Sequence, residues 1–124
     1  MRQKIFYTTL TLLVTLNAPT YPQDLFGPKT DYGTGVSPTG VFSADLDGDN
    51  DLVAANERSD DVSVLLNNVD GTFADKVDYT TGDFPTGVFS VDLDGDGDND
   101  LAVANRFRRN VSNVSVLLNL STQP

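Results

Sequence analysis

The segment from Asp92 to Asp100 reads DLDGDGDND and places five carboxylates within nine residues. At an effective dielectric of about 20, two carboxylates roughly 5 Å apart repel each other by about 3 kcal/mol. A tight loop of this composition therefore needs a cation. Oxygen ligands stand at its first, third, fifth and ninth positions, which are Asp92, Asp94, Asp96 and Asp100, and glycines stand at the fourth and sixth. Oxygen-only ligands around a flexible loop suit a hard divalent ion, and we expect Ca²⁺.

The composition narrows the class of function. Lys and Arg total 8 against 18 Asp and Glu, so the formal net charge is −10. Nucleic acid is an unfavourable partner for such a chain, because affinity for it depends on cationic groups that meet phosphates. The chain has no cysteine and no histidine. Disulfides and cysteine-ligated zinc are therefore excluded, and the commonest general base is missing.

The chain repeats itself. FGPKTDY at 26–32 returns as FADKVDY at 73–79, and PTGVFSAD at 38–45 returns as PTGVFSVD at 85–92, both at an offset of 47. DLVAAN at 51–56 returns as DLAVAN at an offset of 49, and VSVLLN at 62–67 returns unchanged at an offset of 52. The growing offset locates two insertions in the second copy, one of them in the acidic loop. Insertions between apolar runs are typical of loops.

Each copy predicts short β-strands and no helix. β-branched and aromatic residues alternate with polar ones, and Asp, Asn and Gly bound the runs. In the second copy we expect strands near 73–79, 88–92, 101–104 and 114–119. Four strands in about 45 residues is the size of one propeller blade. The predicted fold class is all-β, with two four-stranded antiparallel propeller-blade-like repeats forming a partial or open β-propeller.

These motifs resemble the FG-GAP/VCBS repeat, the calcium-loop repeat of integrin-α-type β-propellers. The resemblance rests on F-x-x-K-x-D-Y, P-T-G-V-F-S, the aspartate loop followed by D-L-A-V-A-N, V-S-V-L-L-N, and N-x-D-G-T-F at 68–73, and it covers residues 24–120. In that family the loop joins two neighbouring strands of a blade and holds calcium. The resemblance implies that Asp92, Asp94, Asp96 and Asp100 bind through their side chains and Asp98 through its backbone carbonyl.

The first copy departs from this pattern, because its loop is two residues shorter. Asp45, Asp47 and Asp49 still occupy the first, third and fifth positions. The sixth position is Asn50, a residue that tolerates a left-handed turn. Asp51 falls at the seventh position, so the closing ligand is either lost or supplied by Asp51 in altered geometry. We expect a weaker calcium site here.

The N-terminus is typical of a secretory signal. Two basic residues precede an apolar run of about 12 residues, which is too short to span a bilayer as a helix. We therefore expect a signal peptide at 1–20, a first repeat at 24–72 and a second at 73–124, and a secreted or cell-surface location. A buried first strand or helix is the alternative for the apolar run.

The predicted function is a calcium-binding repeat module that acts as a binding or adhesion scaffold, with a protein or glycan ligand, and is not an enzyme. The alternative is an accessory part of a secreted polysaccharide-acting enzyme. Paired carboxylates serve glycoside cleavage, but here metal ligation accounts for the clustered acids. Closed propellers usually need four or more blades. The chain is therefore the remainder of a longer propeller, an open stack, or one member of a homo-oligomer. The strand near 26–32 would pair with the last repeat and close a sheet.

Overall fold

The computed structural model describes residues 25–107 and 111–121. The chain divides into two compact units, residues 1–30 and residues 31–124. In the first unit the described residues, 25–30, contain neither helix nor strand. The predicted signal peptide at 1–20 lies outside the described residues. The second unit holds every described strand and both acidic loops.

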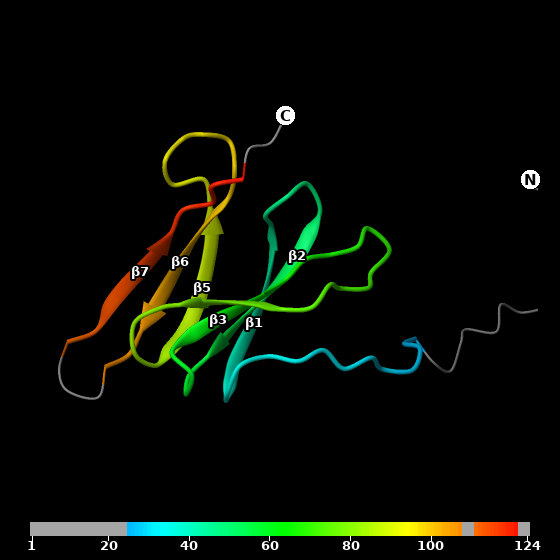
Figure 1. Cartoon of the computed structure of the whole chain (residues 1–124), viewed down its shortest axis with the longest axis horizontal. Helices are drawn as coiled ribbons and strands as arrows, with labels where there is room; N and C mark the ends of the chain where they lie inside the picture. Colours follow the sequence, from blue (N-terminus) through cyan, green and yellow to red (C-terminus); the bar gives the residue numbers. More distant parts are fainter. Residues whose placement is uncertain (1–24, 108–110, 122–124) are drawn as a thin grey trace, which may run out of the picture. The chain divides into compact units, whose positions relative to one another are not determined.

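The described part of the chain is all-β, as the alternating runs predict. The strands are β1 (Pro38–Asp45), β2 (Asn50–Asn56), β3 (Asp61–Leu65), β4 (Val77–Thr80), β5 (Pro85–Val91), β6 (Asp100–Asn105) and β7 (Asn113–Leu117). They form a four-stranded sheet in the order β1-β2-β3-β4 and a three-stranded sheet in the order β5-β6-β7 (Figure 1). All pairings are antiparallel. The prediction of open, propeller-blade-like sheets is confirmed.

The sheets do not coincide with the sequence repeats. β4 lies in the segment 73–79 that opens the second repeat, yet it pairs with β3 of the first repeat, with Tyr79 opposite Val62. The second sheet therefore has three strands among the described residues, where we expected four. The stretch 26–32, which shares the F-x-x-K-x-D-Y motif, contains no strand. This motif becomes a strand where a neighbouring edge supplies the backbone hydrogen bonds.

The two sheets stack through unlike faces. Residues paired across antiparallel strands share a face, so each sheet has two repeat-related faces, which we call A and B. Face A carries Phe42, Ala44, Val53, Ala55, Val62 and Val64 in the first sheet and Phe89, Val91, Ala102, Ala104, Val114 and Val116 in the second. Face B carries Val41, Leu52, Ala54, Ser63 and Leu65 in the first sheet and Val88, Leu101, Val103, Ser115 and Leu117 in the second.

The hydrophobic core joins face A of the first sheet to face B of the second. Its buried members are Ala44, Val53, Ala55, Val62 and Val64 from the first sheet and Val88, Leu101 and Val103 from the second. Small alanines alternate with valines, which lets the sheets approach closely. Because β2 and β3 lie inside the first sheet and are buried on both faces, their residues are almost continuously apolar.

A buried polar contact fixes the end of each sheet opposite the acidic loop. In the first sheet, Asn56 Nδ2 donates to Ser63 Oγ at 2.8 Å, and the Gly35 N–H donates to the same hydroxyl at 3.0 Å. In the second sheet, Asn105 Nδ2 donates to Ser115 Oγ at 2.8 Å, and the equivalent glycine N–H donates at 2.9 Å. The chain thus enters each sheet through a glycine held against a serine, which is buried in the first sheet and half-buried in the second.

Gly82→Ala tests this entry point. A Cβ built at Gly82 would lie 2.7 Å from Asn105 Nδ2 and 2.9 Å from Asn113 Oδ1, both of which are hydrogen-bonded to each other. We expect the variant to lose about 1–3 kcal/mol of unfolding free energy, measured by urea denaturation. Gly87→Ala is the matched control, since a Cβ there has nothing within 4 Å. Equal stability of the two variants would contradict the tight fit.

Candidate metal centre

The two acidic segments form the loops between β1 and β2 and between β5 and β6, and both lie at the same end of the sheets (Figure 1). Gly48, Gly95 and Gly97 adopt positive φ angles of 120°, 82° and 98°. Side chains avoid this region of backbone space, so the predicted need for glycine at these positions is met. Asn50 is not among the described residues with positive φ and instead begins β2.

Each loop brings three carboxylates together. Asp47, Asp49 and Asp51 form one group, and Asp92, Asp94 and Asp100 form the other; within each, one oxygen per residue lies within 4.8 Å of the others. Calcium–oxygen bonds are about 2.4 Å long, so two oxygens on one ion are at most about 4.8 Å apart. Both groups are therefore compact enough for a single ion to contact all three carboxylates.

The aspartate that closes the first loop is buried and makes two backbone contacts. Asp51 Oδ2 accepts from the Leu46 N–H at 3.0 Å, and Asp51 Oδ1 accepts from the Asn67 N–H at 2.8 Å. One oxygen thus holds the start of the loop and the other holds the chain just after β3. Because each carboxylate oxygen has two lone pairs, both oxygens keep the capacity to bind a cation.

The second loop repeats this arrangement despite its two extra residues. Asp100 Oδ2 accepts from the Leu93 N–H at 2.7 Å, and Asp100 Oδ1 accepts from the Asn119 N–H at 2.7 Å. These bonds, the one from Asn119 first, hold the pKa of Asp100 below its ordinary value of 3.8. Asp51 is therefore the structural counterpart of Asp100, and the insertion lies between the fifth position and the closing aspartate.

The remaining predicted ligands, Asp45, Asp96 and Asp98, lie outside these groups. Within the second group, Asp92 Oδ1 and Oδ2 also accept from the N–H groups of Gly95 and Gly97 at 2.7 and 2.9 Å. Asp45 Oδ1 makes the matching bond to its own loop, at 2.7 Å. Asp96 Oδ1 accepts from the Asp98 N–H at 3.0 Å, and neither of these two residues belongs to the group of three.

The crowded carboxylates are electrostatically unfavourable. Removal from solvent, with repulsion from neighbouring carboxylates, raises the pKa values of Asp49, Asp94 and Asp98 above 3.8. Asp49 Oδ1 is also buried, and no hydrogen-bond donor among the described residues reaches it. An unpartnered buried oxygen beside two further carboxylates fits a cation better than it fits an ordinary surface turn. Oxygen-only donors of this kind fit Ca²⁺.

Asn67 and Asn119 contribute to the loops from outside them. Asn67 Nδ2 donates to the Asn50 carbonyl at 2.9 Å, and Asn119 Nδ2 donates to the Asn99 carbonyl at 3.1 Å. Asn119 Nδ2 also reaches the Leu46 carbonyl of the first loop at 2.8 Å. Sequence reasoning missed this role. Its signal was the asparagine that ends V-S-V-L-L-N in both repeats.

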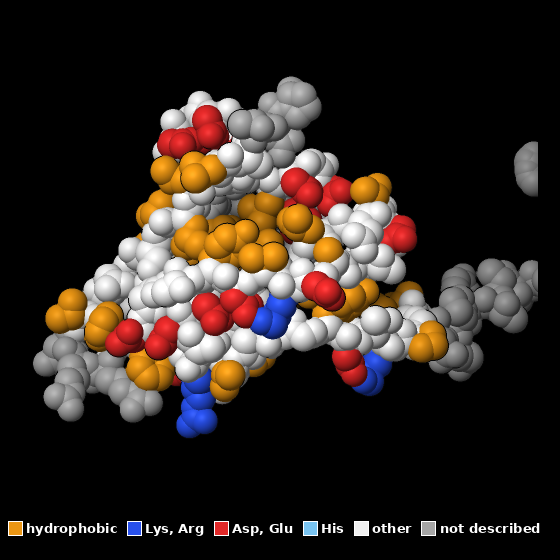
Figure 2. Space-filling model, viewed as in Figure 1, with side chains coloured by type: hydrophobic (Ala, Val, Ile, Leu, Met, Phe, Trp, Pro, Cys, Tyr) orange, Lys and Arg blue, Asp and Glu red, His pale blue; other side chains and the backbone are white. Residues whose placement is uncertain are grey.

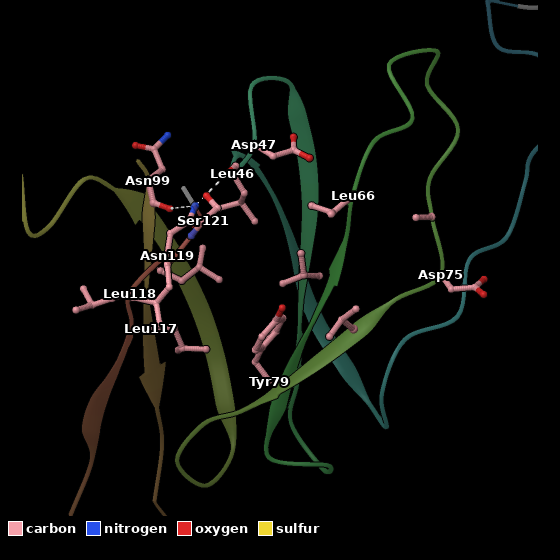
Figure 3. A pocket seen from close by; sticks show the side chains of 15 residues that line it. Leu46, Asp47, Leu66, Asp75, Tyr79, Asn99, Leu117, Leu118, Asn119 and Ser121 are labelled. Atoms are coloured by element: carbon pink, nitrogen blue, oxygen red, sulfur yellow. Dashed lines mark hydrogen bonds between the residues drawn. The ribbon is translucent and has the colours of Figure 1, made fainter. Parts of the chain in front are cut away.

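A concavity lies beside the loops, between the outer parts of the two sheets. It has a volume of about 560 Å³ and is mostly apolar. Figure 2 shows hydrophobic side chains gathered at the centre of this face, with acidic ones towards the loop end and also on the opposite side of the patch. Leu66 and Tyr79 project into it from one side and Leu117 from the other (Figure 3). This groove is the candidate site for an organic ligand.

The fold and the loops define a class: a repeat protein whose antiparallel sheets stack like propeller blades and carry an aspartate-rich loop at one end. Comparison with protein families identifies the class. A model described as the FG-GAP-like repeat matches residues 44–103, which run from the end of β1 to β6 and include both loops. This match, over 60 of the 124 residues, supports the prediction of an FG-GAP-type repeat protein. Searches of curated proteins and of solved structures gave no match.

The family carries general expectations. FG-GAP repeats are typically non-catalytic scaffold modules, are typical of extracellular or cell-surface proteins, and often bind Ca²⁺. Within the described residues, no helix is long and apolar enough to cross a membrane.

The shifted pKa values predict an unusual pH profile when metal is chelated. A raised pKa means that Asp49, Asp94 and Asp98 stabilise the fold once protonated and lose that contribution as pH rises through the raised value. A lowered pKa means that Asp78 and Asp100 stabilise the fold above 3.8 and lose that contribution below it. For the metal-free protein, we expect the melting temperature to rise as pH falls from 7 through the raised pKa values and to drop below 3.8.

Asp49→Asn tests the expected rise in melting temperature on acidification. The amide has no charge at neutral pH, so we expect a smaller rise on acidification than in the wild type. A melting temperature that falls steadily from pH 7 downward in both proteins would contradict the raised pKa values.

Proposed function

We propose that this protein is a calcium-binding repeat module that serves as a binding scaffold, with one ion in each aspartate loop. The observation that carries the proposal is the closing aspartate. Asp51 and Asp100 are buried, make matching backbone contacts and each complete a group of three carboxylates. Positive charge would stabilise a buried carboxylate that lies beside two others.

In the first loop, Asp47, Asp49 and Asp51 would hold the ion; in the second loop, Asp92, Asp94 and Asp100 would. Both groups contain the aspartate at the third loop position and the aspartate that closes the loop. The remaining member is at the fifth position in the first loop, Asp49, and at the first position in the second loop, Asp92. Asp96 and the Asp98 carbonyl would join the second site if the loop tightens around the ion. Bound Ca²⁺ would neutralise the repulsion and tie the loop to the strand that follows it.

The energetic gain is moderate. With a dissociation constant of about 10⁻⁴ M and millimolar calcium, binding to the folded state alone adds roughly 1.4 kcal/mol per site. This is a sizeable share of the stability of a small β domain. A site of this affinity would be occupied at the calcium concentrations outside cells. The family match supports a secreted or cell-surface location for this protein.

The scaffold role rests on the groove. Its lining is apolar in the middle, with Asp47, Asn99 and Asn119 at the loop end. A cavity of several hundred Å³ with few, localised polar groups is typical of ligand sites. We expect a protein or glycan ligand rather than nucleic acid, because the chain carries a net charge of −10. The calcium loops would position the polar edge of this groove.

Thermal melting with and without calcium tests the metal sites. We expect millimolar Ca²⁺ to raise the melting temperature by several degrees, since 1 kcal/mol moves a domain of this size by about 4 °C. Asp94→Ala and Asp100→Ala should remove most of the rise, and Asp47→Ala should remove a smaller part. Asp83→Ala is the charge-matched control, because Asp83 is exposed and lies outside both loops.

Isothermal titration of the same variants separates binding from stability. The proposal fails if the wild-type chain takes up no Ca²⁺ at millimolar concentration, or if Asp94→Ala binds it as the wild type does.

A further inference from the structure

We propose that Asn99 and Asn119 couple the two aspartate loops, so that a cation held in one loop strengthens the binding of a second cation in the other. This coupling rests on the calcium binding proposed above and determines how the two sites act together. Hydrogen bonds that run from one closing aspartate to the other provide the connection.

Two residues, Leu46 and Asn119, connect the closing aspartates. Asp51 Oδ2 accepts from the Leu46 N–H at 3.0 Å, and the Leu46 carbonyl accepts from Asn119 Nδ2 at 2.8 Å (Figure 3). The backbone N–H of Asn119 in turn donates to Asp100 Oδ1 at 2.7 Å. Three hydrogen bonds therefore join the buried carboxylate of the first loop to that of the second.

Asn99, which lies in the longer second loop, makes another link between the loops. Asn99 Nδ2 donates to the Asp45 carbonyl at 3.0 Å, and the Asn99 carbonyl accepts from Asn119 Nδ2 at 3.1 Å. Side chains of the second repeat thus hold the carbonyls of Asp45 and Leu46. These two residues come directly before Asp47, the first member of the carboxylate group in the first loop.

The side chains that make these links belong to the second repeat. Asn67 is the counterpart of Asn119, and its Nδ2 donates to the Asn50 carbonyl within the first loop. The bond from Asn119 to Asn99 is the equivalent of this contact, and the bond to Leu46 is additional. Substitutions at Asn99 and Asn119 therefore address the link between the loops.

Restraint of the loops explains why one cation would favour the other. With an ion in the second loop, Asp100 is restrained, and through Asn119 and Asn99 so are the carbonyls at the start of the first loop. A loop whose start is already restrained loses less conformational entropy when its carboxylates gather around an ion. The effect is reciprocal, because a coupling free energy between two sites acts equally on both.

Repulsion between the two cations opposes this gain. Asp47 and Asp94 are exposed, so the repulsion acts largely through solvent. Salt screens such interactions over about 8 Å at 0.15 M ionic strength, whereas direct hydrogen bonds are screened much less. We therefore expect net positive coupling at this ionic strength.

Titration calorimetry with Ca²⁺ at this ionic strength tests the coupling through a binding cycle. Asp94→Ala leaves the first site alone, and Asp47→Ala leaves the second site alone. For independent sites, the overall constant for two ions in the wild type equals the product of the two single-site constants. We expect the wild-type constant to exceed that product about fivefold, at the lower end of the couplings usually found between two sites.

Asn99→Ala, introduced into all three proteins, removes a link without changing a carboxylate. We expect it to lower the excess, and Asn119→Ala to abolish it, since that variant loses the Nδ2 bonds to both loops and keeps its backbone bond to Asp100. Asn68→Ala is the matched control, because Asn68 Nδ2 donates to Thr72 Oγ1 at 3.1 Å within its own turn. The excess should persist in this control.

The outcomes separate the coupling from calcium binding itself. Two ions that bind independently in the wild type would overturn the coupling and leave the proposed calcium sites standing. An excess that neither Asn99→Ala nor Asn119→Ala lowers would overturn the role of these two residues. A wild-type chain that binds no Ca²⁺ would overturn the proposed function and the coupling together.

Discussion

The two hydrogen bonds made by the closing aspartate are the contact on which this structure depends. In each sheet, one buried carboxylate holds the N–H of the residue that follows the first strand and the N–H of the asparagine that follows the third. Three strands are therefore fixed at one end by a single side chain. The same side chain places a negative charge beside two others, so that sheet geometry and loop electrostatics cannot change independently.

This coupling connects the fold to the proposed function. A loop that only reversed the chain would need glycine and a single aspartate. Here Asp49, Asp94 and Asp98 have raised pKa values, whereas the closing Asp100 has a lowered pKa because it accepts hydrogen bonds from backbone N–H groups. The closing carboxylate thus remains charged in the apo fold, and a bound cation would offset the cost that falls on its neighbours. The groove shares Leu46 and Asn119 with this region, so a ligand there would sense the state of the loops.

Much of the fold could be predicted from the sequence, because the motifs repeat and their alternation is local. β5, β6 and β7 fall close to the predicted runs, and both acidic loops connect neighbouring strands. The partner of a strand was harder to predict. β4 is exposed along its whole length, so no burial pattern in its own sequence shows which sheet it joins. The stretch 26–32 has the same motif but contains no strand, since a strand also needs the edge of a neighbouring strand to supply its backbone hydrogen bonds.

The site was predicted in part for a related reason. Counting positions along the first loop put Asp51 at the seventh position and left its role as the closing ligand open. The structure shows that closure is determined by contacts with Asn67, sixteen residues away, rather than by the count within the loop. Such a contact can be seen only after the strands are aligned. The family match spans both loops.

The offset between repeat and sheet has a consequence for how such chains grow. Because the first sheet takes its outer strand from the repeat that follows, a tandem duplication of about 47 residues would add a whole sheet wherever the duplicated unit begins. The new sheet meets the old one through surfaces that already fit, and the terminal edge keeps its chemistry. Genes of this type can therefore gain or lose units by unequal recombination while the junctions between units stay the same.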